Sequence, residues 1–231
     1  MELTFAAPST PVIPVTGSTA LFPVHRIYCV GRNYAEHSIE MGGTGREAPF
    51  FFMKPADAVV PVAAGEVGHM PYPTKTSNLH HEVELVVAIG KGGAAIPVEK
   101  AHQHIWGYAV GLDMTRRDLQ AQSKQQGRPW CTSKGFDLSA PIGPILPAAA
   151  ASDVETAAIR LTVNGVVRQE SQLNKMTWNV NEIIAELSQF YTLQPGDLIF
   201  TGTPEGVGAV VAGDTLEANI EGIGQLTLKI T

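Results

Sequence analysis

The spacing of apolar residues along the chain predicts many short strands and few helices. The apolar runs are short and are separated by turn-forming Gly, Pro, Asn and Asp. We expect strands at residues 26–31, 49–55 (buried), 58–63, 105–112, 198–201, 215–220 and 225–230. A hairpin is predicted between Ile159 and Gln169, because Asn164-Gly165 readily adopts the positive φ angles of a type I′ turn.

Helical periodicity is clearest between Asn179 and Phe190, where one apolar face follows a capping-box pair of Asn179 and Glu182. Helices are also expected at 116–126 and 97–104. At 33–41, Asn33 and Glu36 resemble a second capping box, and a glycine-rich stretch follows. A short helix beside glycines suits a mobile lid, and an ordinary surface loop would look the same.

The order of these elements is not a β-α-β alternation, so we expect a mainly β fold with flanking helices (α+β). No stretch is rich enough in linker residues to divide the chain. The sequence predicts an extended N-terminal arm at 1–24 and one domain at 25–231.

Composition narrows the functional classes. The 231 residues carry a formal net charge of −6 without a basic run, which argues against a nucleic-acid or membrane-surface binder. Two cysteines are too few for a disulfide framework or a Cys-based zinc site. Because neither a signal peptide nor a long apolar run is recognisable, we expect a cytoplasmic protein.

Two carboxylates interrupt the most strand-prone run, residues 79–90. Side chains alternate along a strand, so Glu82 and Glu84 should point the same way, with His80 on that face and about 7 Å between the two glutamate Cα atoms. The pair indicates either a divalent-cation site or a solvated sheet face.

A third acid, Asp113, ends the strand at 105–112. Two like charges about 4 Å apart repel by about 4 kcal/mol at an effective dielectric constant of 20, so three converging acids favour a bound cation or protonation. Oxygen ligands favour Mg²⁺ or Mn²⁺ with waters completing the shell. Ligation by His80 would favour zinc, although adjacent histidines more often hold carboxylate ligands in place.

Other polar residues have a functional and a plain interpretation. His37 and Glu40 would share a helix face, either as a general base with its orienting acid or as a surface pair. Lys134, Arg117 and Gln120 could face the acids or be ordinary surface residues. The loop at 202–208 lacks the spacing of a nucleotide-binding fingerprint, but its turn could present Thr203 to a ligand.

Taken together, the sequence resembles the fumarylacetoacetate hydrolase family, in particular its single-domain branch of acylpyruvate and fumarylpyruvate hydrolases. The resemblance runs in order from about residue 25 to the end of the chain. Its segments are Val30-Gly31-Arg32-Asn33-Tyr34, Lys54-Pro55, Leu79 to Leu85, Gly111 to Gln120, Lys134-Gly135-Phe136-Asp137 and Gly196 to Gly208.

This resemblance implies a mixed β-sandwich roll, usually a homodimer, and a Mg²⁺- or Mn²⁺-dependent hydrolase acting on carbon–carbon bonds in ketonic substances. The substrate would be a dioxo acid, foremost fumarylpyruvate, cleaved to fumarate and pyruvate in gentisate-type aromatic degradation. The implied metal ligands are Glu82, Glu84 and Asp113; the implied catalytic residues are His37, Glu40 and Lys134; the implied substrate contacts are Arg117, Gln120 and Thr203, with Arg32 as a further choice for the far carboxylate.

Two alternatives remain at this point. The same enolate-stabilising site would serve acetylpyruvate hydrolysis, or oxaloacetate decarboxylation or tautomerisation, and the latter two need no hydrolytic water. A cation-stabilised binding domain without catalysis is the alternative outside the enzymes.

Overall fold

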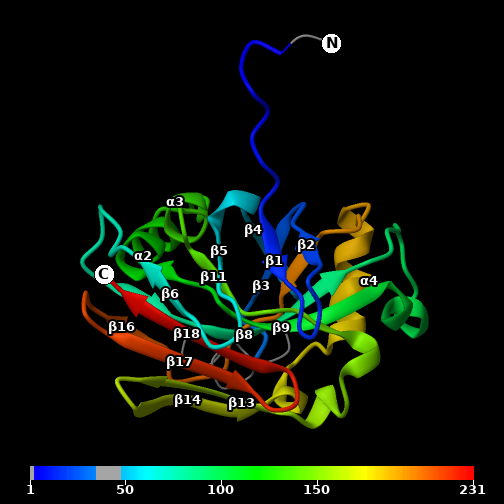
Figure 1. The fold of residues 1–231 in the computed structure, drawn as a ribbon. Helices are drawn as coiled ribbons and strands as arrows, with labels where there is room; N and C mark the ends of the chain where they lie inside the picture. The colour runs from blue at the N-terminus through cyan, green and yellow to red at the C-terminus, as the bar shows by residue number, and fades with distance from the viewer. Residues whose placement is uncertain (1–2, 35–47) are drawn as a thin grey trace.

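The protein, described from a computed structural model, is defined over residues 3–34 and 48–231. Within these residues the largest sheet is eight-stranded and has the order β4-β3-β15-β8-β9-β11-β5, with β12 pairing with β9 (Figure 1). Its strands are β3 (Ile27–Gly31), β4 (Phe50–Lys54), β5 (Val59–Pro61), β8 (Val83–Ile89), β9 (Ile105–Leu112), β11 (Ala140–Ile142), β12 (Leu146–Pro147) and β15 (Leu198–Phe200).

Three smaller sheets complete the described strands. The five-stranded sheet has the order β14 (Val166–Gln172), β13 (Ala158–Val163), β17 (Thr215–Ile220), β18 (Gly224–Ile230) and β6 (Val67–Met70). The three-stranded sheet has the order β10 (Thr115–Arg116), β7 (Leu79–His81) and β16 (Gly208–Val210). The two-stranded sheet pairs β1 (Val12–Pro14) with β2 (Leu21–Pro23).

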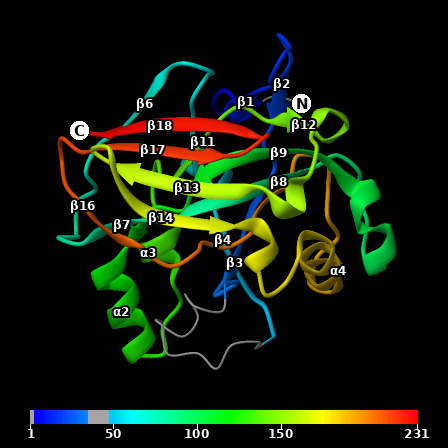
Figure 2. The ribbon, with the colours of Figure 1, turned by 90° about the horizontal axis from the view of Figure 1, so that it is seen from below.

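The helices flank the sheets. Figure 2 shows α2 and α4 toward opposite sides of the molecule. The α-helices of the described part are α2 (Arg117–Gln125), α3 (Cys131–Lys134) and α4 (Val180–Phe190). The 3₁₀ helices are η1 (Ala56–Ala58), η2 (Val98–His104), η3 (Ala148–Ala150), η4 (Val154–Thr156) and η5 (Leu173–Lys175). Parallel and antiparallel pairs occur in the same sheets, so the expected mainly β, mixed-sheet fold with few helices is confirmed.

The eight-stranded sheet has an apolar core on each face. Alternate residues of β8, including Val83 and Leu85, pack in a core that also holds α4 and the five-stranded sheet. Val86 and Ala88 point the other way, into a second core. Glu84 shares this second face, because it alternates with Val83 and Leu85. On this second face, apolar side chains are therefore replaced by the carboxylate of Glu84 at the start of β8.

The N-terminal residues 12–23 form a hairpin that buries Ile13 and Phe22 in the second core. Residues 3–10 are exposed and extend away from the body (Figure 1). The division into an arm and a domain at residue 25 stays a prediction. No helix in the described residues is long and apolar enough to span a membrane.

Several sequence predictions are confirmed in detail. Asn164 and Gly165 have φ angles of 53° and 78°, as the type I′ turn requires. In the capping box of α4, Glu182 N donates to Asn179 Oδ1 at 3.0 Å, and Asn179 N donates to Glu182 Oε2 at 2.9 Å.

Other predictions are corrected. The segment 49–55 is an edge strand, so its aromatic side chains are half-buried or exposed and only Lys54 is buried. The segment 97–104 is a 3₁₀ helix rather than an α-helix. Asn33 bonds Trp178 and Thr201 through its side chain, at distances of 2.8–2.9 Å. The remainder of the helix expected at 33–41 lies outside the described residues, so that helix stays a prediction.

Candidate metal and substrate site

The run at 79–90 is not one strand but two, and Glu82 lies between them. β7 pairs with β10 and β16, whereas β8 pairs with β9 and β15 in the large sheet. Val83 lies opposite Leu112, and the N–H of Asp113 donates to the carbonyl oxygen of Glu82 at 2.9 Å. Residues opposed across antiparallel strands project to the same face, so this register brings Asp113 and Glu82 together.

The structure thus brings together the three acids that the sequence singled out. Carboxylate oxygens of Glu82, Glu84 and Asp113 lie within 4.8 Å of one another, and all three side chains are buried. An all-oxygen set of this kind fits a hard divalent cation. Burial, together with Asp113 and Glu82, raises the pKa of Glu84 well above its usual range, although the Gly202 N–H donates to its Oε2 at 2.8 Å. The three carboxylates form a divalent-metal site.

Basic side chains also reach these carboxylates. Lys134 Nζ donates to Glu82 Oε2 at 2.7 Å and to Asp113 Oδ2 at 2.6 Å. Lys54 Nζ lies 2.8 Å from Asp113 Oδ1, and Arg117 pairs with Glu82. Burial lowers the pKa of Lys134, but Asp113 and Glu82 outweigh it and raise the pKa overall. These two carboxylates therefore hold Lys134 as a cation.

Two contributors to this site were not identified as functional from the sequence. Lys54 leaves the apolar strand β4 and bonds the carbonyl oxygens of Met114 and Lys134 besides pairing with Asp113. Gln169 is buried at the far end of the 159–169 hairpin. A lone lysine in an apolar strand was a visible signal for Lys54, whereas nothing local distinguishes Gln169 from an ordinary strand residue.

Gln169 fixes the loop after β15 to the start of β8. Its Nε2 donates to Thr203 Oγ1 at 2.7 Å and to the Pro204 carbonyl at 2.9 Å, while its Oε1 accepts from Val83 N at 3.1 Å. Thr203 Oγ1 in turn donates to the Val83 carbonyl at 2.8 Å. Thr203 lines the cleft, but its proton is already committed, so it can offer a ligand only a lone pair.

The two histidines do not hold the carboxylates, contrary to the sequence expectation. His81 Nδ1 lies 2.9 Å from Gln169 Oε1, and His80 Nδ1 accepts from Arg117 Nε at 3.3 Å. Burial and then Arg117 lower the pKa of His80 to about 4, so the ring is neutral at pH 7. Within the described residues, His80 therefore contacts the site through its hydrogen bond with Arg117.

A small cleft opens over the acids. Its lining includes the sequence candidates Arg32, Arg117, Gln120, Lys134 and Thr203 and the aromatic residues Phe50, Phe52 and Trp130. Gln120 Oε1 accepts from Arg117 at 2.6 Å, and within the described residues its amide N–H groups have no partner. The cleft has a volume of about 30 Å³. His37 and Glu40 lie outside the described residues.

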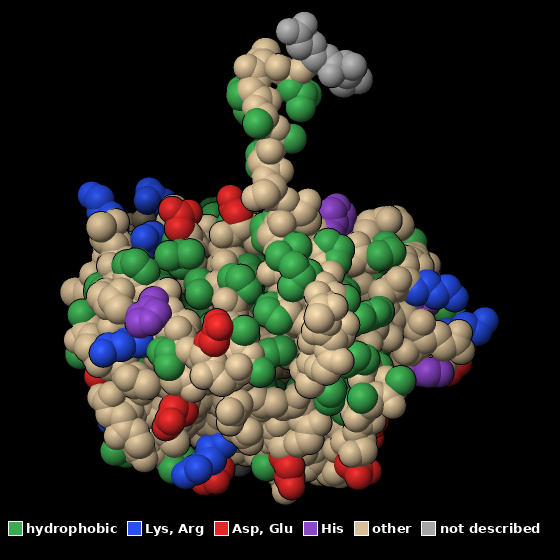
Figure 3. Space-filling model, viewed as in Figure 1, with side chains coloured by type: hydrophobic (Ala, Val, Ile, Leu, Met, Phe, Trp, Pro, Cys, Tyr) green, Lys and Arg blue, Asp and Glu red, His purple; other side chains and the backbone are tan. Residues whose placement is uncertain are grey.

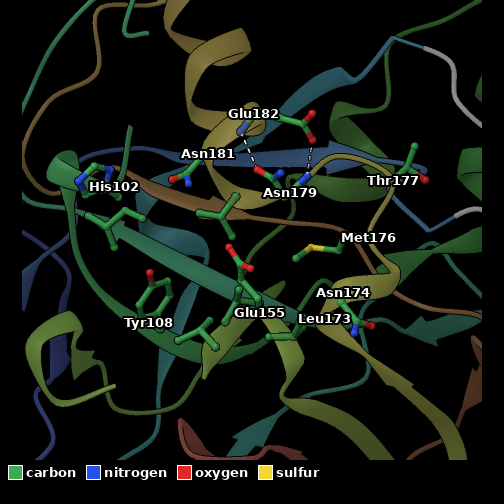
Figure 4. A pocket seen from close by; sticks show the side chains of 14 residues that line it. His102, Tyr108, Glu155, Leu173, Asn174, Met176, Thr177, Asn179, Asn181 and Glu182 are labelled. Carbon is green, nitrogen blue, oxygen red and sulfur yellow. Dashed lines mark hydrogen bonds between the residues drawn. The ribbon is translucent and has the colours of Figure 1, made fainter. Parts of the chain in front are cut away.

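A larger cavity, of about 500 Å³, lies across β8 from the acids. Leu85 contributes to its wall, whereas Glu84 lines the cleft, and neighbouring strand residues point to opposite faces. Figure 4 shows the hydrogen-bonded pair of Asn179 and Glu182 and the separate carboxylate of Glu155 around this cavity. In the described part of the chain, the cluster of three metal-ligating side chains is found at the cleft and not here. By volume, this cavity would be the candidate for the functional site, but the metal-ligating side chains identify the cleft as that site.

Comparisons with known proteins agree with this choice. Residues 26–231 match the family of fumarylacetoacetate hydrolase C-terminal domains. A fumarylpyruvate hydrolase of Ralstonia sp is 50% identical over 184 residues, covering 80% of this chain and 93% of that protein. The human mitochondrial oxaloacetate tautomerase FAHD1 is 41% identical, covering 88% of this chain and 90% of that protein.

A solved structure has nearly the same fold. The fumarylpyruvate hydrolase of Pseudomonas aeruginosa, in complex with Mn²⁺ and pyruvate, superposes with a TM-score of 0.98 at 54% identity. The match covers 100% of this chain and 99% of that one.

Proposed function

The chain belongs to the fumarylacetoacetate hydrolase family, and on that premise we propose that it hydrolyses the C–C bond of an acylpyruvate, foremost fumarylpyruvate. The carrying observation is the buried cluster of Glu82, Glu84 and Asp113 with Lys134 bonded to two of them. The products are fumarate and pyruvate, formed with the consumption of one water molecule.

Glu82, Glu84 and Asp113 would hold Mn²⁺ or Mg²⁺. Such an ion, when bound, polarises the dioxo end of the substrate and stabilises negative charge there. Support for Mn²⁺ comes from the Pseudomonas aeruginosa complex. The fit rests on the donor chemistry, because all the donors of the cluster are carboxylate oxygens.

Other side chains of the cleft would bind the substrate and stabilise the charge that develops on it. The amide N–H groups of Gln120 and the guanidinium of Arg117 face the cleft and would orient the pyruvyl carboxylate. Lys134, held as a cation, would stabilise the negative charge that develops on the pyruvyl end as the C–C bond breaks.

The attacking group is water, added to the acyl carbonyl. From the sequence we propose His37 as the base that takes the proton from this water and Glu40 as the acid that orients the imidazole. The electrons of the C–C bond pass to the pyruvyl carbon, which is then protonated to give pyruvate. Hydrolysis needs this base to activate water, whereas tautomerisation of a dioxo acid consumes no water and moves a proton from carbon to oxygen.

Turnover tests this proposal directly. We expect cleavage of fumarylpyruvate with Mn²⁺ or Mg²⁺, none with EDTA, and none by His37→Ala. Absence of fumarylpyruvate cleavage by the wild type with Mn²⁺ present would overturn the proposal. Oxaloacetate tautomerisation is the second candidate, supported by the similarity to the human tautomerase. Tautomerisation of oxaloacetate by the wild type, without cleavage of fumarylpyruvate, would establish that second activity instead.

A homodimer is also proposed. Figure 3 shows hydrophobic side chains gathered around the foot of the N-terminal segment, with charged side chains mostly toward the edges of this face. Leu21, at 56% exposure, lies in β2 of the N-terminal hairpin. Patches of this kind on soluble proteins commonly mark interaction surfaces. Light scattering after size exclusion should give twice the mass of 24.6 kDa, and the monomer mass would refute the proposal.

A further inference from the structure

Helix α2 brings a third functional position to the cleft. Arg117, Gln120 and Lys124 are three and four residues apart, so they share one helix face, and all three line the cleft. Lys124 lies about 6 Å farther along the helix axis than Gln120. Because Arg117 reaches the acid cluster, Lys124 lies on the side of the cleft away from it. This is where the acyl end of a substrate anchored at the acids would lie.

In the part of the chain that the structure describes, Lys124 has no partner that neutralises its charge. Within the described residues its ammonium makes no hydrogen bond or ion pair, and its nearest recorded contact is the ring of Trp130, 5.4 Å from Nζ. Arg117 and Lys134, in contrast, are both paired with Glu82. Burial, then Arg32 and Arg117, lowers the pKa of Lys124 to about 8; Glu82 opposes this shift, and Lys134 adds to it.

The cleft is electropositive although the protein carries a net charge of −6. Among its described lining residues four are cationic and two are anionic, and behind them Asp113 is paired with Lys54. A half-buried ammonium among like charges is unfavourable unless an anion joins it. Among the described residues, the cation of the cleft without an acidic partner on the acid-distant side is Lys124.

Aromatic rings line the cleft from the acids to Lys124, because the Phe52 ring lies 5.1 Å from Lys134 Nζ and Trp130 contacts Lys124. The Trp130 ring lies 5.3 Å from that of Phe50 and 5.8 Å from that of Phe52, centre to centre. Flat apolar walls beside a cation suit a planar, unsaturated chain that ends in a carboxylate. A short acyl group such as acetyl would use neither the walls nor the cation.

We propose that Lys124 binds the far carboxylate of the acyl chain and makes the enzyme selective for acylpyruvates whose acyl group ends in a carboxylate. Trp130 holds the ammonium over its ring, and the acyl chain lies against the aromatic walls. The assignment rests on the proposed hydrolase function. It makes Lys124 a specificity-determining residue in the cleft that Arg32, the residue the sequence suggested for the same carboxylate, also lines.

The test compares two substrates across three variants. Lys124→Met keeps the apolar stem and removes the charge, Lys124→Arg keeps the charge, and Lys100→Met removes an exposed lysine that does not line the cleft. The readout is kcat/KM for fumarylpyruvate divided by kcat/KM for acetylpyruvate, measured with saturating Mn²⁺. We expect this ratio to fall by about tenfold to a hundredfold in Lys124→Met, to recover largely in Lys124→Arg and to stay constant in Lys100→Met.

A ratio within twofold of wild type in Lys124→Met overturns the assignment, whereas failure of the wild type to cleave fumarylpyruvate overturns the hydrolase function instead. Calorimetry tests the assignment without turnover. With Mn²⁺ present, Lys124→Met should weaken the binding of fumarate at least tenfold more than it weakens the binding of pyruvate. Equal weakening of the two ligands would show a general loss of structure and would also overturn the assignment.

Discussion

Lys134 offers the sharpest test of the electrostatics of this site. Its ammonium lies 2.7 Å from a Glu82 oxygen and 2.6 Å from an Asp113 oxygen, and the side chain is 3% exposed. Lys134→Met replaces it with an uncharged side chain of similar length and leaves two buried carboxylates facing each other. Removing one partner of a buried ion pair destabilises a protein by about 3–5 kcal/mol.

That free energy converts into a measurable change in Tm. For 231 residues the unfolding entropy is about 0.5 kcal/mol/K, so the loss corresponds to about 6–10 °C at neutral pH in EDTA. The matched control is Lys229→Met, which removes an exposed lysine from β18. Combining Lys134→Met with Glu82→Gln should recover part of the loss, because one of the unneutralised charges is then absent.

A divalent cation should replace part of the missing charge. We expect Mn²⁺ to raise the Tm of Lys134→Met more than that of the wild type, while turnover stays lost because the cation at Lys134 is missing. Thermal scans with and without Mn²⁺ measure both effects. A loss of less than about 1 kcal/mol in EDTA, below the range for a broken buried pair, would refute the reasoning, as would an equal Mn²⁺ response in the two proteins.

Three further outcomes are expected. The pKa of Glu84 is raised in the folded, cation-free protein, so this protein loses stability as the pH rises above the usual carboxyl pKa. Glu84→Gln should therefore raise Tm in EDTA at pH 7–8 and abolish Mn²⁺-dependent turnover. An unchanged Tm would contradict this expectation. Gln169→Leu should destabilise by about 1–3 kcal/mol in urea titrations, because Thr203 and Val83 lose partners, whereas the exposed Gln172→Leu in the same strand should not. Since the pKa of Lys124 is about 8, the KM for fumarylpyruvate should rise between pH 7 and 9 in the wild type and stay flat in Lys124→Arg; parallel profiles would exclude Lys124 as the cause.

The sequence could predict what depends on neighbouring residues. Alternation along β8 correctly separated Glu84 from Val83 and Leu85, and the end of β9 correctly located Asp113. The turn at Asn164 followed equally from local backbone preference. In each case the information lies within one element or at its end.

What the sequence could not predict depends on partners far along the chain. The residues around Glu82 read as one strand, and the break arises because β7 pairs with β10 and β16 while β8 pairs with β9. The edge position of β4 follows from strand order, which periodicity does not encode. Lys54 and Gln169 matter through contacts 60 and 86 residues away, to Met114 and Val83.

The junction at Glu82 has a consequence for local motion. Glu82 lies where the chain passes from the three-stranded sheet into the eight-stranded sheet. A metal ion bound by its carboxylate would therefore restrain the two sheets relative to each other. A metal ion that binds only when the two sheets are in place raises the free energy of local opening, and the increase grows with the metal concentration. The backbone amides of β7 and β16 should therefore exchange with solvent deuterium more slowly when the site is filled, and their protection would report metal occupancy in the absence of any substrate.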